Sequence, residues 1–265
     1  MRATCLAARS TCGARETWAC GGTATRATAS GSGGPVSPVA PPPPPDLRRL
    51  PPPPPSLLYL LRTGRTSNAA HAIWAAVLDG RSGVFAVDAT AGLGGDTVGL
   101  ARCLGSTGRV LALDLQPSAL AATAAALVAA GADPESPPLA PVDLVLACHS
   151  TLSALLAACE RPLLANFNLG YLPAAGTAGR GTAVAAATAT SPATTMPALT
   201  AAAASLAPGG VITVASYVGH PGGLEEAASV SAFLGGLDPG TWVVSETRQP
   251  NRPGAPRLGV AYKKE

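Results

Sequence analysis

The chain has 265 residues and a formal net charge of +3, and Asp, Glu, Lys and Arg make up 12% of it. A chain of this length holds one or two domains, and a charge this small argues against a global basic field for nucleic acid, although a local basic patch beside a site can suffice. Gly, Pro or polar residues interrupt every long apolar run, so we expect no membrane-spanning helix.

Residues 1–55 have the composition of a leader rather than of a folded domain. Up to the first proline run, at 41–45, four arginines stand against a single acid, Glu16, which is typical of an organelle transit peptide; a merely disordered tail is the alternative. That proline run and a second, at 51–55, favour a stiff polyproline II spacer. We therefore predict a leader for the chloroplast, or alternatively the mitochondrion, before one catalytic domain over 56–265.

Three of the six cysteines lie in this predicted domain, at Cys103, Cys148 and Cys159. They form neither a C-x-x-C pair nor a metal-ligand spacing. The pattern therefore indicates a reducing compartment and no metal centre.

From residue 57 onward, short apolar runs alternate with longer Ala/Leu segments, which indicates strands and helices in turn. We predict strands over 84–90, 109–115, 142–148, 163–169, 211–218, 241–248 and 257–263. We predict helices over 95–104, 117–130, 151–159, 194–207 and 224–236.

Near-continuous apolar strands joined by helices favour a parallel sheet that is covered on both faces. The loop at 249–256 contains no helix, so the last two strands should pair antiparallel. The predicted fold class is therefore α/β, with a seven-stranded, mostly parallel sheet and an antiparallel last strand, and this architecture resembles that of the Rossmann-like class I methyltransferases. Ligands of such folds bind at the carboxyl ends of the strands.

A glycine-rich turn, Asp88-Ala-Thr-Ala-Gly-Leu-Gly-Gly-Asp-Thr97, joins the first predicted strand to the first helix. Its glycines allow a tight turn and the close approach of a ligand, but the full G-x-G-x-x-G dinucleotide fingerprint is missing. Asp88 suits a cofactor with a positive amino group; a tight connection without a ligand is the alternative. The candidate cofactor-binding residues here are Asp88, Thr90, Gly92, Gly94, Asp96 and Thr97.

A second acid, Asp114, ends the second predicted strand, where a carboxylate can accept both hydroxyl protons of a ribose. Gln116 is a candidate to assist it or, equally, a solvent-facing residue. His149, after the third strand, is a candidate to border an adenine or to neighbour a helix cap at Ser150.

Residues 167–173 read Phe-Asn-Leu-Gly-Tyr-Leu-Pro and end the fourth predicted strand. A side-chain amide, a flexible glycine, an aromatic plane and a proline-fixed carbonyl can together hold a planar or amino-bearing group. Asn168 and Tyr171 are therefore candidate catalytic residues, and Asn168 is also a candidate cofactor contact.

His220 follows the fifth predicted strand, in a loop with three glycines and a proline. It is a candidate catalytic residue that takes a proton from an amine or binds the substrate, and a structural hydrogen bond is the alternative. Glu225 and Glu226 come next, and for Glu226 we prefer a simple interaction with the helix dipole.

With these residues assembled, the chain resembles a small family of class I S-adenosylmethionine methyltransferases labelled rRNA methylases. The resemblance runs from about Ala69 to Lys263. Its segments are AHAIW at 70–74, DATAGLGGDT at 88–97, FNLGYLP at 167–173, TT at 194–195, YVGHPGG at 217–223 and a loop with Asn251.

Characterised bacterial members of this family methylate the aminomethyl group of a modified wobble uridine in tRNA. The resemblance implies S-adenosylmethionine as cofactor and tRNA as substrate, with the methionine part at Asp88 and the Gly92–Gly95 backbone and the ribose at Asp114. Asn168 and Tyr171 would orient the acceptor nitrogen. A homodimer stays an open alternative.

Two segments depart from the family pattern. Leu93-Gly94-Gly95-Asp96 stands where the family usually has Asn-Gly-His-Asp, and Ala174-Ala175-Gly176-Thr177 stands where it has Gly-Gly-Asp-Lys. Arg180 is the candidate substitute for that lysine. A nicotinamide-dependent oxidoreductase and a catalytically weakened RNA-binding homologue are the alternative functions.

Overall fold

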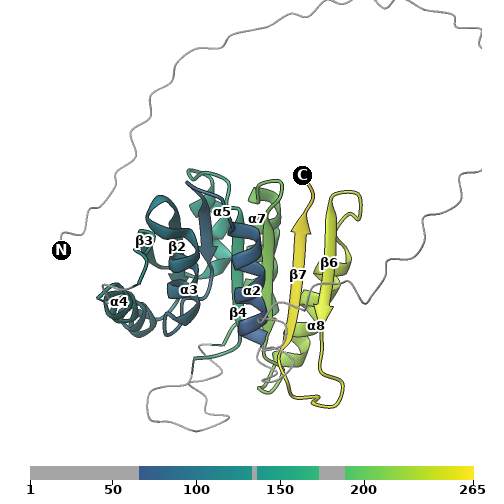
Figure 1. The fold of residues 1–265 in the computed structure, drawn as a ribbon. Coiled ribbons are helices and arrows are strands. Elements are labelled where there is room, and N and C mark those ends of the chain that lie inside the picture. Colours follow the sequence, from purple (N-terminus) through teal and green to yellow (C-terminus); the bar gives the residue numbers. More distant parts are fainter. Residues whose placement is uncertain (1–65, 133–135, 173–188) are drawn as a thin grey trace, which may run out of the picture. The chain divides into compact units, whose positions relative to one another are not determined.

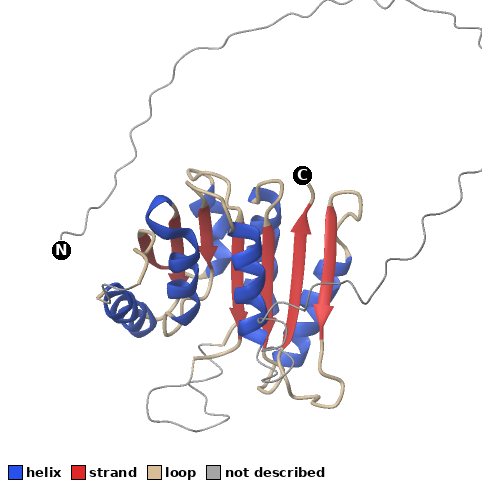
Figure 2. Ribbon diagram, viewed as in Figure 1, coloured by secondary structure: helices blue, strands red, loops and turns tan. Residues whose placement is uncertain are grey.

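In the computed structural model, residues 66–132, 136–172 and 189–265 are described. They form one sheet with helices on both faces (Figures 1 and 2). The predicted leader, Pro173, the Ala174–Thr177 departure and Arg180 lie outside the described residues. None of the described helices is long and apolar enough to cross a membrane.

The sheet has seven strands in the order β3-β2-β1-β4-β5-β7-β6. Their bounds are β1 Phe85–Asp88, β2 Arg109–Asp114, β3 Val142–Leu146, β4 Leu164–Leu169, β5 Val211–Ser216, β6 Trp242–Thr247 and β7 Arg257–Lys263. Strands β1 to β5 pair in parallel, and β7 pairs antiparallel with both β5 and β6. The predicted strands and the antiparallel end of the sheet are therefore confirmed, while the insertion of β7 between β5 and β6 is an addition to the prediction.

Alternation of side chains along the strands places apolar residues on both faces of the sheet. Phe85 and Val87 of β1 pack into one buried cluster, whereas Ala86 between them packs into the other. Strand β2 repeats this pattern, with Leu111 in the first cluster and Val110 in the second. The double burial explains why these strands read as continuous apolar runs.

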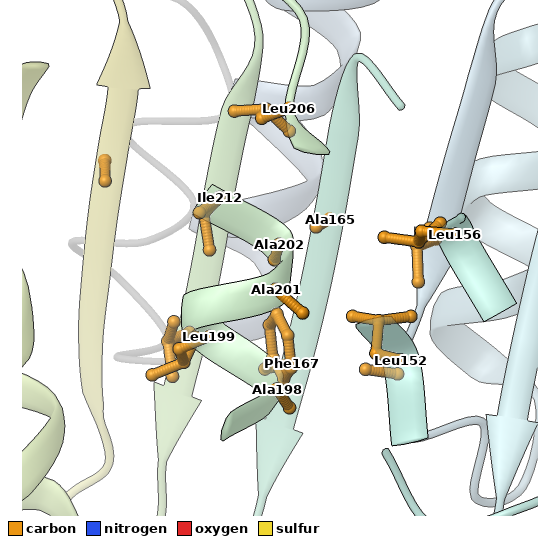
Figure 3. Close-up of a cluster of buried hydrophobic side chains, with 14 of the residues drawn as sticks. Leu152, Leu156, Ala165, Phe167, Ala198, Leu199, Ala201, Ala202, Leu206 and Ile212 are labelled. Atoms are coloured by element: carbon orange, nitrogen blue, oxygen red, sulfur yellow. The ribbon is translucent and has the colours of Figure 1, made fainter. Parts of the chain in front are cut away.

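Six α-helices with described bounds cover the two faces. They are α2 Thr66–Leu78, α3 Gly95–Leu104, α4 Pro117–Gly131, α5 Leu152–Leu156, α7 Pro192–Ser205 and α8 Gly223–Gly235. Helices α2, α3 and α4 pack on one face, and α5, α7 and α8 pack on the other. In Figure 3, Phe167 of β4 lies beside Ala198 and Ala201 of α7, so the apolar first residue of the 167–173 segment anchors β4 in the core.

Three local features differ from the sequence prediction. Helix α2 was not among the predicted helices, although its Trp74 is fully buried. The helix expected over 151–159 is a 3₁₀ turn, His149–Thr151 (η3), followed by the short α5. The Ser150 cap is wrong, because its hydroxyl contacts the Cys148 sulfur at 3.1 Å and caps no helix.

Candidate functional site

The candidate residues gather at the carboxyl edge of the sheet, where β1, β2 and β4 end side by side. Asp88 of β1 pairs in register with Ala112 of β2 on one side and with Asn166 of β4 on the other. Asp114 and Asn168 stand two residues further along these neighbours. The parallel register therefore brings the predicted cofactor and acceptor residues to one edge.

Asp88 is fully buried at the end of β1 and is tied to the turn that follows it. Its Oδ2 accepts the Thr97 hydroxyl at 2.6 Å, and its Oδ1 accepts the Thr90 backbone N–H at 3.3 Å. Burial, with the nearby Asp96 as a second cause, raises the pKa of Asp88 to about 7. In this structure Asp88 therefore organises the turn from within, and Thr90 and Thr97 are its partners.

Asp114 joins the glycine-rich turn to the end of β2. Its Oδ2 accepts the backbone N–H of Gly92 at 2.9 Å, and its Oδ1 accepts that of Gln116 at 2.9 Å. A carboxylate can accept about four hydrogen bonds, so each oxygen keeps capacity for a ribose hydroxyl. Gln116 takes part through its backbone and precedes α4, whose first residue is Pro117.

The glycines of the turn meet different surroundings. Gly94 has a φ of +85°, and a Cβ there would lie 2.8 Å from the Thr123 Cα of α4, so glycine is required for helix packing. Gly92 has a φ of +55°, and a Cβ there would lie no closer than 3.9 Å to the surrounding atoms, while a Cβ at Gly95 would meet nothing within 4 Å. The open backbone therefore lies at Gly92 and at Gly95, the first residue of α3.

Asp96 connects this turn to β4. Its Oδ2 accepts the side-chain amide of Asn168 at 3.0 Å, while the Asn168 backbone N–H donates to the Thr90 hydroxyl at 2.7 Å. The Asn166 amide reaches the same Oδ2 at 3.4 Å. The predicted acceptor residue and the predicted cofactor turn thus form one hydrogen-bonded unit.

Helix α2 adds residues that the sequence reasoning missed. His71 Nε2 lies 2.7 Å from Asp96 Oδ1, and the centroid of its ring lies 4.5 Å from that of Trp74, with the two planes tilted by 36°. The Trp74 indole donates to the Thr213 hydroxyl of β5 at 2.9 Å, and Thr213 donates to Asn166 Oδ1 at 3.0 Å. The AHAIW segment was the signal, since it carries both His71 and Trp74.

Tyr217, the first residue of the YVGHPGG segment, is a further missed residue. Its pKa is raised by burial and then by the charge of Asp96, and a hydrogen bond to Asn168 opposes this rise. Tyr217 thus adds a hydroxyl to the Asp96–Asn168 unit from the end of β5.

The rings of Tyr171 and His220 make an edge-to-face contact, with centroids 5.6 Å apart at an interplanar angle of 76°. His220 Nδ1 lies 2.9 Å from the carbonyl of Pro221, and since a carbonyl only accepts, Nδ1 carries the proton. Nε2 is enclosed, close to Gly223, and has no hydrogen-bond partner among the described residues. In neutral His220 the free lone pair is therefore on Nε2, which must be uncovered before it can accept a proton.

His149 and Glu226 both contact Thr195 of α7. His149 is buried, its pKa is lowered mainly by that burial, and its Nε2 lies 3.4 Å from the Thr195 hydroxyl. The interpretation of Glu226 as a helix-dipole residue alone is wrong, since the side chain is 2% exposed and accepts hydroxyls of Thr190 and Thr195. The TT segment at 194–195 contains one of these partners.

This arrangement fits the expected adenosyl cofactor. The open backbone at Gly92 and Gly95 leaves room where a side chain would intrude, and α3 begins there, so its first N–H groups face the same place. Asp114 supplies the carboxylate at the end of the neighbouring strand. The described ranges contain no group of three or more His, Cys, Asp or Glu side chains arranged for a metal ion.

Comparison with known proteins shows sequence similarity over most of the chain. Residues 110–263 match the family described as "Putative rRNA methylase". The tRNA (mnm(5)s(2)U34)-methyltransferase, chloroplastic, of Arabidopsis thaliana is 34% identical over 212 residues, which are 78% of this chain and 72% of that protein.

Two solved structures share the fold at comparable identity. One, from Clostridium thermocellum, carries the same rRNA methylase name; it is 31% identical, with a TM-score of 0.63, and covers 75% of this chain and 97% of its own. The other, from Streptococcus mutans, was solved in complex with SAH; it is 30% identical, with a TM-score of 0.60, and covers 75% of this chain and 98% of its own. The chain therefore belongs to the rRNA methylase family of S-adenosylmethionine-dependent methyltransferases.

Proposed function

We propose that this methyltransferase transfers a methyl group to the aminomethyl nitrogen of a modified wobble uridine in tRNA. The name of the 34% identical Arabidopsis relative supports this substrate. The carrying observation in the structure is that Asn168, the candidate acceptor residue, donates its amide to Asp96 of the cofactor turn at 3.0 Å. A site that brings cofactor and acceptor together needs the residues for each to be held in a fixed relative position, and this hydrogen bond does so.

On the cofactor side, the backbone at Gly92 and Gly95 and the N-terminus of α3 receive the methionine part, and Asp114 receives the ribose. When bound, the cofactor supplies an electrophilic methyl group on a sulfonium centre. Asp88 keeps the turn in place through Thr97 and Thr90. His149 lies at the end of β3 near Asp114, where the adenine is expected.

On the acceptor side, Asn168 and Tyr171 orient the amine. In methyl transfer to an amine, most of the rate acceleration comes from binding both reactants side by side in the right orientation, because they then need not meet in solution. The side chain of Asn168 is held by Asp96, and its backbone is held by Thr90, so its direction is fixed before the substrate arrives.

The amine must be neutral when it reacts, and the proton of the product ammonium must leave. His220 is the proposed proton acceptor, through Nε2, once the loop around Gly223 exposes it. Its edge-to-face contact with Tyr171 supports a role on the acceptor side.

The proposed setting is an organelle. Residues 1–55 have the composition of a transit peptide, and the Arabidopsis relative is named chloroplastic. The proposed assignment is the chloroplast, with tRNA as the partner of the domain over 56–265.

The test is mass spectrometry of tRNA nucleosides after incubation of the purified protein with S-adenosylmethionine and tRNA that bears the aminomethyl uridine. The expected result is conversion of that nucleoside alone to its methylaminomethyl form. A matched tRNA with unmodified uridine at the same position serves as control. Binding of S-adenosylmethionine without methyl transfer to either tRNA would instead favour a weakened RNA-binding homologue.

A further inference from the structure

A buried acid at the start of α8 has hydrogen bonds that the helix dipole does not explain. Glu226 is 2% exposed; its Oε2 accepts the Thr190 hydroxyl at 2.7 Å and its Oε1 accepts the Thr195 hydroxyl at 2.6 Å. A dipole interaction alone requires no burial, and the neighbouring Glu225, in the same turn, is exposed. Both oxygens of Glu226 are therefore committed to particular side chains.

Thr190 carries this connection to the end of β4. The Gly170 backbone N–H donates to the Thr190 hydroxyl oxygen at 2.9 Å, and the Thr190 N–H donates to the Gly170 carbonyl at 2.8 Å. Thr190 has one hydroxyl proton, and the 2.7 Å contact directs it to Glu226, so its lone pairs face Gly170. Both backbone polar groups of Gly170 are thus fixed by a residue that Glu226 orients.

Gly170 lies between the two candidate acceptor residues. Asn168 stands two positions before it, and Tyr171 directly follows it. Gly170 has a φ of +156°, a conformation that L side chains rarely adopt, and a Cβ there would lie 3.4 Å from the Tyr217 Cβ. The direction in which the chain leaves β4, and with it the place of Tyr171, depends on how Gly170 is held.

We propose that Glu226 is a positioning residue that sets the acceptor segment Asn168–Tyr171 through Thr190 and Gly170. Its role is indirect: it fixes the chain from the α8 side, while Thr90 and Asp96 fix Asn168 from the cofactor side. The inference rests on the proposed acceptor roles of Asn168 and Tyr171.

The opposite oxygen of Glu226 anchors it to the core. Thr195 donates its proton to Glu226, so its oxygen accepts from His149 Nε2 across the 3.4 Å contact. Thr195 is fully buried on α7, and His149 is buried at the end of β3. The anchor is therefore a rigid part of the fold, which a positioning residue needs.

The test compares Glu226→Gln, Thr190→Val and the double variant with Glu225→Gln as the matched exposed control, each in the full chain. Glutamine keeps the shape but offers a single acceptor oxygen, and valine removes the hydroxyl without changing the size. Amide hydrogen exchange at Gly170 should accelerate about tenfold or more in the first two variants. The reason is that the hydrogen bond from the Gly170 N–H to the Thr190 hydroxyl, which protects this amide, is weakened when Thr190 loses its orientation and is lost when Thr190 loses its hydroxyl. It should stay unchanged in Glu225→Gln.

The second readout separates binding from positioning. Each single variant should lower kcat/KM for tRNA about tenfold, the affinity for S-adenosylhomocysteine should change less than about twofold, and the double variant should be no worse than either alone. Unchanged exchange at Gly170 in Glu226→Gln, or independent losses of kcat/KM that add in the double variant, would overturn the proposal. If the unaltered chain fails to methylate the tRNA, the proposed substrate is wrong, and hydrogen exchange still decides whether Glu226 holds the segment.

Discussion

At the first turn of α3, Asp96 is contacted by side chains from two other elements. His71 of α2 lies 2.7 Å from Oδ1, and Asn168 of β4 donates to Oδ2 at 3.0 Å. The Asp96 side chain is 15% exposed, so these contacts are only partly screened by water. Its position makes the orientation of Asn168 dependent on α2 and α3 together.

Replacing Asn168 with alanine tests the acceptor side. We expect Asn168→Ala to lower turnover by at least about 100-fold, since the amide that orients the amine is lost, while the affinity for S-adenosylhomocysteine stays within about threefold. Single-turnover methylation and calorimetry measure the two quantities. Methylation at the unaltered rate would remove Asn168 from the mechanism.

Asp88 predicts a pH dependence of stability. Burial raises its pKa from 3.8 to about 7, so between these values the folded protein holds a proton that the unfolded chain releases. Stability conferred by this group is therefore fully present below about pH 4 and is lost as the pH rises toward 7, by on the order of 4 kcal/mol at most.

Asp88→Asn keeps the size of the side chain but cannot ionise. Urea unfolding at several pH values should therefore show the unaltered protein losing stability relative to Asp88→Asn as the pH rises from 4 to 7. Parallel stability curves for the two proteins across this range would contradict the raised pKa.

At the level of elements, two neighbouring glycines of the turn between β1 and α3 have different roles: Gly94 is needed for packing against α4, and Gly95 leaves open backbone for a ligand. Gly94→Ala should destabilise the fold by roughly 2–4 kcal/mol, because its Cβ would meet Thr123 Cα at 2.8 Å and its φ is +85°. Gly95→Ala, one residue on, should be neutral or stabilising by up to about 1 kcal/mol, since its Cβ meets nothing within 4 Å. Urea unfolding compares them, and equal losses would show that the Gly94 contact relaxes freely.

Strands were the elements that the sequence predicted best. Double burial makes each central strand a continuous apolar run, and Gly and Pro mark its ends, so all seven strands were found with boundaries within two residues. Helix α2 was missed because its Ala-rich sequence lacks a strong apolar stripe. Its position also depends on a hydrogen bond from Trp74 to Thr213, which is 139 residues away in the sequence. The roles of Glu226 and Asn166 were missed for the same reason, since their partners come from other elements.

Across the whole molecule, the sheet order decides which of these residues meet. The hairpin of β6 and β7 was predicted from its loop, but the place of β7 beside β5 depends on pairing that no local pattern specifies. The parallel order β2-β1-β4 was implied by the fold class, and it brings Asp114, Asp88 and Asn168 to one edge. Sequence patterns thus named the candidate residues, and the cross-strand register determined the hydrogen bonds between them.

The domain boundary makes a prediction of its own. A chain of residues 56–265 should bind S-adenosylhomocysteine with the affinity of the full chain, because every residue assigned to the site lies after position 65. Residues 1–55 fused to a fluorescent protein should enter chloroplasts. Loss of cofactor binding on truncation, or retention of the fusion in the cytosol, would contradict this division.

The most direct test of the proposed activity is the nucleoside composition of tRNA treated with the purified protein and S-adenosylmethionine. The account predicts that the aminomethyl uridine at the wobble position gains one methyl group in the unaltered protein and none in Asn168→Ala. Methyl transfer that is equally fast in both proteins, or that falls on another nucleoside, would contradict it.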